Sequence, residues 1–502
     1  MNVYLEKIKQ VLPRILSFTN RNIVNQSYGI GDRLRWAWGT TDFSNSTFQC
    51  QVFGLSCLVR SKFFSKKEKL VFLTHIKILF RGLKNILKLN QGLSEAFPKE
   101  YSYCIYALVA ETYLGALNNI NKYLTKDEYK DWVDTIEPIV WFLINEKETH
   151  GKITNHQSSA ALAILRWSKI KKDKNTRDFF KKKINLIKKN QSTEGWFYEY
   201  DGFDPGYETL NLNNLIQINS IIKDKNINKR INKSVKFLSN FIHPDLSFGG
   251  QYGSRNTNFI FPGGIEIFSK LSQNAKIFSD LIKQSIKEGK HSTILSMDDN
   301  NLVPMFNSYC LALINLNKSK KLKRKISNKN EIFYKSGLII KSNKNFYLII
   351  NFKKGGLFYY FKGKKIIKNY GVLIKYKKNF YSTQKFDEKN ILYKNKNKII
   401  VTSSFKKINY RNINLYEFLI LRLLSLTIFN FSFFREKFKQ KIVNLVINRN
   451  IYINIQNQRI LEINDNKISY RDNLSNKDRC ELITNKNYFS HIHMASQGYW
   501  HK

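Results

Sequence analysis

Asn155 and His156 stand side by side at the expected start of a helix over residues 156–170. Asparagine is a preferred N-cap residue, so we expect Asn155 to cap this helix. His156 would then lie in the first turn, where the helix dipole lowers the pKa of an imidazole and favours its neutral form. A neutral imidazole can accept a hydrogen bond or a proton, which is the functional interpretation of this pair. A histidine with a purely structural role is the alternative that the sequence leaves open.

A second group of reactive side chains runs from Glu194 to Thr209, between two expected helices. This stretch combines aromatic rings, carboxylates and glycines. Rings stack on the apolar faces of sugars, while carboxylates and phenols bind hydroxyl groups or move protons. We therefore name Tyr200 and Tyr207 as candidates for proton transfer and Trp196 as a ring that contacts substrate. A rigid turn, whose rings only cover the end of the helical part, is the alternative.

Three further residues extend the candidate binding surface. Arg255 lies in a segment with three glycines, and its guanidinium offers a bidentate clamp for a carboxylate or a sulfate. Glu100 could face a ligand, although Pro98 followed by Glu100 is also a good helix start. Trp36 belongs to a segment that mixes charged residues with indole rings. We expect this segment either to line a ligand site or only to cap the N-terminal helix. A structural arginine under a loop is the alternative for Arg255.

The first 320 residues must position these side chains, and they show apolar residues at helical spacing throughout, as in Leu70, Leu73, Ile76 and Leu79. The expected helices are 1–18, 47–60, 67–88, 100–120, 127–147, 156–170, 176–190, 208–223, 229–242, 260–272, 276–288 and 301–316. Weak repeats of about 50 residues indicate an array of helical hairpins, and the short connections favour closure into an α/α toroid.

The pattern changes after a basic linker over residues 318–330. From Glu331 onward, β-branched and aromatic residues alternate with polar ones, as in Asn345 to Ile350, and glycine-containing turns separate the runs. Such alternation predicts an antiparallel β-sandwich. The sequence therefore predicts an α+β multidomain protein, with an α/α toroid over residues 1–320 and a β-sandwich over residues 331–502.

The composition indicates a globular chain with an anionic partner. Its 502 residues are 42% apolar and carry a formal net charge of +46. Such a charge favours nucleic acid, anionic lipid or acidic polysaccharide. The lysines are dispersed along the chain, so charge alone does not select among these classes. The sequence contains no recognisable nucleic-acid-binding module, which argues against nucleic acid.

Five scattered cysteines without a CxxC pair argue against a disulfide framework and a structural zinc site. We expect no metal and no cofactor. The N-terminal 20 residues lack the continuous apolar region of a secretory signal, so we expect a cytoplasmic location. The sequence does not indicate an oligomeric state.

The most apolar run extends from Phe418 to Phe434, and Arg422 interrupts it. It is too short for a comfortable membrane span. We expect a buried helix or a buried strand pair. Peripheral contact with a membrane surface is the alternative, and the basic residues that would help it are Arg435, Lys437, Lys439 and Lys441.

The order of these features resembles the heparinase II/III-like and alginate-lyase-like polysaccharide lyases: the pair Asn155-His156, the tyrosine-rich loop and then a β domain. The resemblance implies a toroid joined to a β-sandwich and β-elimination on an acidic, uronate-containing polysaccharide. It further implies that Asn155 neutralises the uronate carboxylate, while His156 and Tyr200 or Tyr207 handle protons. A histidine of the β domain completes such sites, and only His491 and His493 could supply it here.

Other chemistries remain open on the same residues. Proton abstraction without bond cleavage would give a uronate C5-epimerase. Paired carboxylates would serve hydrolysis, with Glu199, Asp201 or Asp204 acting together with Glu100. A non-catalytic protein that binds carbohydrate or takes part in polysaccharide biosynthesis is the remaining alternative. The sequence does not choose among these.

Overall fold

The computed structural model describes residues 2–89, 92–149, 151–317, 328–409, 413–443, 450–464, 467–483 and 488–491. Every helix expected in the first 320 residues has a counterpart, and the short α2 is additional. The helices of this part are α1 (Val3–Ser17), α2 (Arg33–Trp36), α3 (Gln51–Arg60), α4 (Lys66–Lys88), α5 (Tyr103–Ile120), α6 (Lys126–Asn145), α7 (Thr154–Ile170), α8 (Lys174–Lys189), α9 (Pro205–Ile222), α10 (Lys225–Leu238), α11 (Gly263–Phe268), α12 (Gln273–Glu288) and α13 (Asp299–Ile314).

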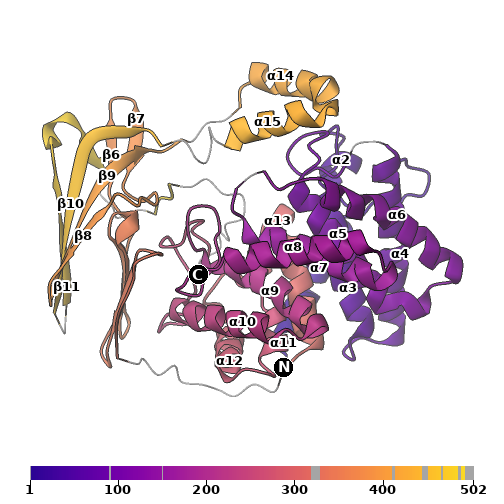
Figure 1. Cartoon of the computed structure of the whole chain (residues 1–502), viewed down its shortest axis with the longest axis horizontal. Coiled ribbons are helices and arrows are strands. Elements are labelled where there is room, and N and C mark those ends of the chain that lie inside the picture. Colours follow the sequence, from indigo (N-terminus) through magenta and orange to yellow (C-terminus); the bar gives the residue numbers. More distant parts are fainter. Residues whose placement is uncertain are drawn as a thin grey trace.

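These helices form a closed double ring, which confirms the predicted α/α toroid. In the inner ring, α3, α5, α7, α9, α11 and α13 each pack against the next, and α13 packs back against α3 (Figure 1). The outer helices α4, α6, α8, α10, α12 and α1 cover them. Inner helices such as α5 are buried almost all round, whereas outer helices such as α8 bury one stripe and expose lysines. This division follows from the layers, because only an inner helix has protein on both sides.

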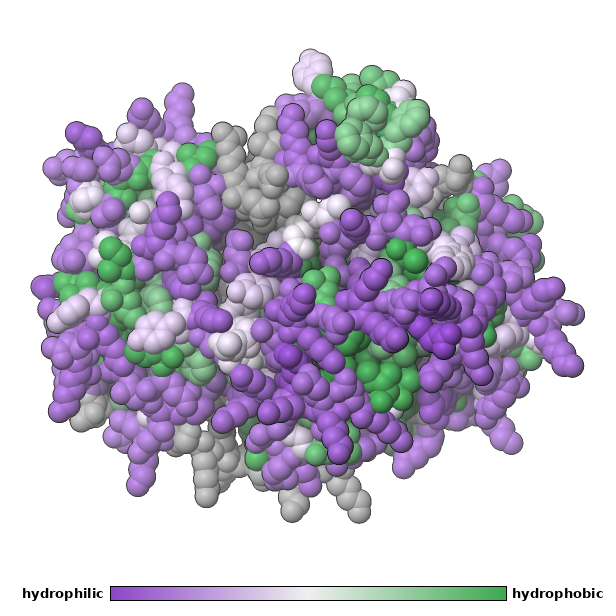
Figure 2. Space-filling view, in the orientation of Figure 1, coloured by the Kyte–Doolittle hydropathy of each residue, from purple (hydrophilic) through white to green (hydrophobic). Residues whose placement is uncertain are grey.

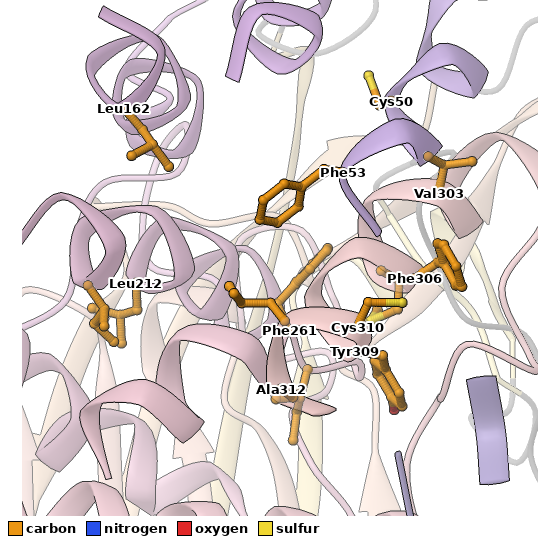
Figure 3. Close-up of a cluster of buried hydrophobic side chains, with 14 of the residues drawn as sticks. Cys50, Phe53, Leu162, Leu212, Phe261, Val303, Phe306, Tyr309, Cys310 and Ala312 are labelled. Atoms are coloured by element: carbon orange, nitrogen blue, oxygen red, sulfur yellow. The ribbon is translucent and has the colours of Figure 1, made fainter. Parts of the chain in front are cut away.

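The closing contact between α3 and α13 depends on a glycine. A Cβ atom at Gly54 would lie 2.5 Å from the ring of Phe306, so only glycine lets the two helices approach this closely. The backbone N–H of Gly54 also donates to Oδ1 of Asn307 at 2.8 Å. Figure 3 shows the surrounding apolar cluster, to which Phe53 and Leu162 contribute from α3 and α7.

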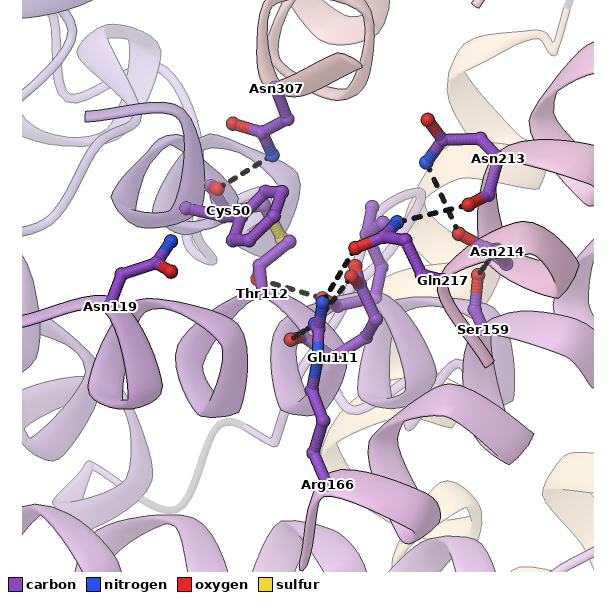
Figure 4. Close-up of polar contacts among 12 residues, drawn as sticks. Cys50, Glu111, Thr112, Asn119, Ser159, Arg166, Asn213, Asn214, Gln217 and Asn307 are labelled. Atoms are coloured by element: carbon purple, nitrogen blue, oxygen red, sulfur yellow. Dashed lines mark hydrogen bonds and ion pairs between the residues drawn. The ribbon is translucent and has the colours of Figure 1, made fainter. Parts of the chain in front are cut away.

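A buried polar network ties three inner helices together inside the ring. Arg166 of α7 donates to the Glu111 carboxylate of α5 at 2.7 Å and to the Gln217 amide oxygen of α9, also at 2.7 Å (Figure 4). Each charge in this network therefore has a partner, as buried charges require.

The C-terminal part contains two antiparallel sheets. The first has the order β1-β2-β3-β4-β5, and the second has the order β11-β10-β9-β7-β6-β12, with β8 paired to β9. The strands are β1 (Lys329–Phe333), β2 (Leu338–Ser342), β3 (Tyr347–Asn351), β4 (Leu357–Lys362), β5 (Lys365–Asn369), β6 (Leu373–Tyr376), β7 (Asn379–Ser382), β8 (Ile391–Lys394), β9 (Lys398–Lys407), β10 (Tyr452–Asn464), β11 (Lys467–Leu474) and β12 (Glu481–Ile483).

The two sheets pack face to face, and the first sheet also packs on the toroid. Leu348 and Phe358 share an apolar cluster with Val401 and Leu461 of the second sheet. The alternate residues Ile349 and Tyr359 point the other way and join the toroid core. The antiparallel β-sandwich is thus confirmed, and the first sheet lies between the second sheet and the toroid (Figure 1). The domain boundaries at 320 and 331 stay predictions, because residues 318–327 are outside the described ranges.

A helical hairpin between β9 and β10 departs from the all-β expectation. It consists of α14 (Leu415–Leu426) and α15 (Ser432–Val443). Figure 1 shows it over the toroid, where Arg422 pairs with Asp42 at 3.2 Å and the Arg435 guanidinium lies 4.4 Å from the Tyr101 ring centroid. The expected helix is therefore present, but its expected burial is wrong. The exposed apolar residues of α14 are Leu415, Tyr416, Phe418, Leu419, Ile420, Leu423 and Leu426.

Candidate functional site

The candidate residues gather at one rim of the toroid because of how the double ring is connected. Each segment that leads from an outer helix into an inner helix lies at the same end of the ring. The segments that enter α5, α9 and α11 carry, in that order, Glu100, Tyr200 and Arg255, and His156 lies in the first turn of α7. A closed array of hairpins thus brings side chains from distant parts of the sequence onto one surface.

Glu199 is the centre of this surface, and the sequence did not single it out for that role. Its Oε1 accepts from Nη1 of Arg255 at 2.7 Å, and its Oε2 accepts from Nδ2 of Asn155 at 2.7 Å. Burial raises the pKa of Glu199, while Arg255 and His156 favour its carboxylate form. The carboxylate therefore fixes Asn155 and Arg255 relative to each other.

The Arg255 guanidinium lies between two tyrosine rings. Its central carbon is 3.7 Å from the ring centroid of Tyr207 and 5.2 Å from that of Tyr200. The side chain is 10% exposed, and its Nε has no hydrogen-bond partner in the described part of the chain. A buried donor without a partner is costly, so an acceptor that reached this atom would be bound favourably.

The structure corrects two expectations, the capping position of Asn155 and the charge state of His156. Helix α7 begins earlier, at Thr154, and Ile153 occupies the N-cap position, so Asn155 does not cap the helix. His156 Nδ1 lies 2.6 Å from Oε2 of Glu148. Burial alone would lower the pKa of His156, but Cys104 and Glu148 outweigh burial and raise it well above its ordinary value. The expected neutral imidazole is therefore wrong, because an adjacent carboxylate exceeds the half-charge of a helix dipole.

Three residues expected to bind substrate make contacts that hold the fold. Oε2 of Glu100 accepts the backbone amides of Glu95 and Ala96 at 2.8 and 2.9 Å, which holds the loop before α5. The indole N–H of Trp36 donates to the Phe18 carbonyl at 2.6 Å. Trp196 is only 1% exposed, so the expectation that its ring contacts substrate is wrong. A glycine and aromatic pattern does not distinguish a ring that is buried from one that faces solvent.

The β domain brings a histidine to the same rim. His491 Nδ1 lies 2.7 Å from the Ser382 hydroxyl. Burial lowers the pKa of His491 well below its ordinary value, and nearby lysines add to this shift. The preceding Ser490 accepts a hydrogen bond from Asn256 at 2.7 Å, directly beside Arg255 in the sequence. A neutral histidine therefore stands at the junction of the two domains. His493 lies outside the described residues.

Two further charged residues belong to the site, although sequence reasoning missed them. Lys354 Nζ donates to the Gly253 carbonyl at 2.7 Å and to Oδ1 of Asn256 at 2.8 Å. Desolvation by the surrounding groups and the nearby Glu100 carboxylate raise the pKa of Glu95 to about 7, against the opposing effect of His156 and Arg255. No signal marked Lys354, because Lys and Arg together number 84 in this chain.

The described residues contain no group of three or more His, Cys, Asp and Glu side chains that could hold a metal ion. The rim brings together several side chains that could take part in a reaction. These are a guanidinium with an unused donor, two phenols, an amide, and histidines in opposite charge states.

No family model and no curated protein matches the chain. Solved structures that resemble it include a xanthan lyase of Paenibacillus, with a TM-score of 0.47 and 9% identity over 82% of this chain and 46% of that one. A chondroitin AC lyase of Streptomyces coelicolor matches with a TM-score of 0.47 and 7% identity, over 81% of this chain and 66% of that one.

A heparan sulfate lyase of Pedobacter heparinus matches with a TM-score of 0.43 and 9% identity, over 93% of this chain and 68% of the other. This chain spans less than half of the length of the xanthan lyase. Polysaccharide lyases are thus among the solved structures that this chain resembles. At such identities the likeness concerns the fold alone, and any functional argument rests on the residues of the rim.

Proposed function

We propose that this protein acts on an acidic, uronate-containing polysaccharide and cleaves it by β-elimination at the toroid rim. The observation that carries the proposal is the buried Arg255, whose Nε has no partner among the described residues and whose guanidinium lies between Tyr200 and Tyr207. A carboxylate of the substrate would supply the missing acceptor. Phenols beside it would then be close to the carbon that must lose a proton.

The reaction needs three contributions. The proton on the carbon next to a uronate carboxylate is weakly acidic, and its removal creates an enolate-like charge. Arg255, together with the amide of Asn155, would stabilise this charge at the carboxylate oxygens. A base takes the proton, the electron pair forms a carbon–carbon double bond, the glycosidic carbon–oxygen bond breaks, and the leaving oxygen receives a proton.

The charge states of the rim divide the proton-handling roles. Burial raises the pKa of Tyr200 overall, although Arg255 and His156 oppose this shift, so its phenol is protonated and can donate. A phenol under these cations is suited to pass a proton between substrate atoms, and Tyr207 has the closer guanidinium. His156 is already protonated and ion-paired, so we assign it the role of a fixed positive charge. His491 stays neutral because burial and nearby lysines disfavour its protonated form, so we do not assign it the role of the base.

The test is incubation of the full chain with uronate polymers such as alginate, hyaluronan and xanthan, followed by ultraviolet absorbance of the unsaturated product. We expect product from the unmodified protein and retained binding but little product from Tyr207→Phe or Tyr200→Phe. Binding without product from every polymer would favour the non-catalytic alternative. Product with an inverted uronate and no new chain ends would favour the epimerase.

A further inference from the structure

The hairpin α14–α15 presents an unusually apolar surface to solvent. Figure 2 shows this surface as a patch of hydrophobic side chains at the top of the molecule, over α14 in the orientation of Figure 1. Leu419, Leu423 and Leu426 of α14 are 55%, 63% and 68% exposed, and Phe433 of α15 is 60% exposed. Globular proteins rarely leave so many large apolar side chains together in water unless the surface binds something.

The exposed arc of α14 is wider than a contact with one partner helix requires. At 3.6 residues per turn, its exposed apolar positions from Leu415 to Leu426 cover an arc of roughly 200°. An amphipathic helix that packs on one partner needs an apolar stripe of about 100°. Arg422 is the only basic residue of this helix, and it is turned to Asp42. The hairpin is therefore a convex apolar ridge.

We propose that α14–α15 is a membrane-surface anchor that inserts its apolar ridge into the interfacial layer of an anionic lipid bilayer. None of the helices among the described residues is both long and apolar enough to cross a membrane. Helix α14, with 12 residues, is about 18 Å long, which is shorter than the ~30 Å hydrocarbon core. It is therefore suited to lie in the plane of the interface.

Charge complementarity favours anionic lipid over a second copy of this chain. The exposed lysines of α15 are Lys437 and Lys441, one helical turn apart beside Phe433. The acidic residue of α15, Glu436, pairs inward with Lys439 at 3.2 Å. The hairpin thus presents apolar and cationic groups to solvent on a chain of net charge +46, and two such surfaces would repel each other. Anionic head groups match both components.

The hairpin contacts a loop of the toroid rim directly. The Phe429 ring lies 5.6 Å from that of Phe97, and Lys99 Nζ donates to the Asn430 side chain at 2.8 Å. Phe97 and Lys99 belong to the loop that Glu100 holds at the rim. Binding to a bilayer would therefore keep this rim near the membrane surface.

The test is co-sedimentation of the full chain with vesicles made of equal parts phosphatidylcholine and phosphatidylglycerol. We expect binding that weakens in high salt and on vesicles of phosphatidylcholine alone, because the lysines contribute through the head groups. The double variant Leu419→Glu/Leu423→Glu should lose at least about tenfold in vesicle affinity, since charged residues are costly in the apolar layer.

The matched control is Leu271→Glu, because Leu271 is 74% exposed but lies between α11 and α12. This control should bind vesicles as the unmodified protein does. All of these side chains are exposed, so thermal unfolding should be unchanged in each variant. Absence of vesicle binding, or equal binding by the double variant, would overturn the proposal. A dimer that sedimentation velocity detects, and that the double variant dissociates without any vesicle binding, would assign the ridge to a second copy instead.

Discussion

The replacement Arg255→Lys tests the rim most directly, because the toroid contains a matched arginine away from it. Arg255 and Glu199 form a buried pair at 2.7 Å, and Arg166 and Glu111 form another at 2.7 Å inside the ring. Lysine keeps the positive charge in both pairs but loses the planar fork. We therefore expect each replacement to lower the free energy of unfolding by a similar amount, about 1–3 kcal/mol.

Activity should separate the two variants. Arg255→Lys removes the donor that would face the substrate carboxylate, and loss of one such stabiliser typically lowers turnover by about 10²–10³-fold, or roughly 2.7–4 kcal/mol. Arg166→Lys should retain the turnover of the unmodified protein per folded molecule. The assay measures kcat and KM on the preferred uronate polymer, with urea unfolding to give the folded fraction. Equal losses of turnover in both variants would show that Arg255 acts only through stability and would refute the proposed site.

Three further predictions concern single side chains. Tyr207→Phe should lower kcat about 10²-fold or more with little change in KM. Tyr200→Phe should lower kcat less, because we assign proton transfer mainly to the phenol nearer Arg255. Equal losses of kcat for the two variants in a steady-state assay would contradict this order. Burial raises the pKa of Glu208 from its ordinary value of 4.5 to about 8. Between these two pH values, the folded state holds a proton that the unfolded state has released. The free energy of unfolding should therefore fall as the pH rises from about 4.5 to 8, by at most about 5 kcal/mol, and urea titrations should show that Glu208→Gln removes this part of the pH dependence. Lys354→Met should lower the free energy of unfolding by roughly 3 kcal/mol, because it leaves buried carbonyl groups without donors. The control is Lys353→Met, because the ion-pair partner of Lys353, Glu388, is exposed. Urea titration of this control should show a free energy of unfolding lower by less than about 1 kcal/mol.

The sequence predicted the elements of the fold well, because helical and strand periods follow from which face of each element is buried. Helix α2 was missed since four residues are too few to show a period. The ridge on α14 was expected to be buried because a helix that is apolar all round has the same pattern whether protein or lipid surrounds it. Whether such a helix is buried or exposed depends on its position in the folded molecule, and hydrophobic periodicity does not reveal that position.

The candidate site was predicted in part, and its charges were not. Positions at the starts of inner helices could be found because a closed array of hairpins places them on one rim. The protonated state of His156 could not be found, since it depends on Glu148, which the loop before α7 folds back to within 2.6 Å. Spacing along the chain does not reveal such a contact. The same holds for Glu199, whose two partners come from different segments.

The β-sandwich contributes to the rim by holding the residue next to Arg255. Asn256 has a positive φ of 59°, a conformation that costs a residue other than glycine roughly 1 kcal/mol or more. Its Oδ1 accepts from Lys354 and its Nδ2 donates to Ser490, so both groups of its amide are bound by the β domain. Neither domain alone could therefore fix the backbone that orients Arg255. The candidate site therefore belongs to both domains, which also share a large apolar core.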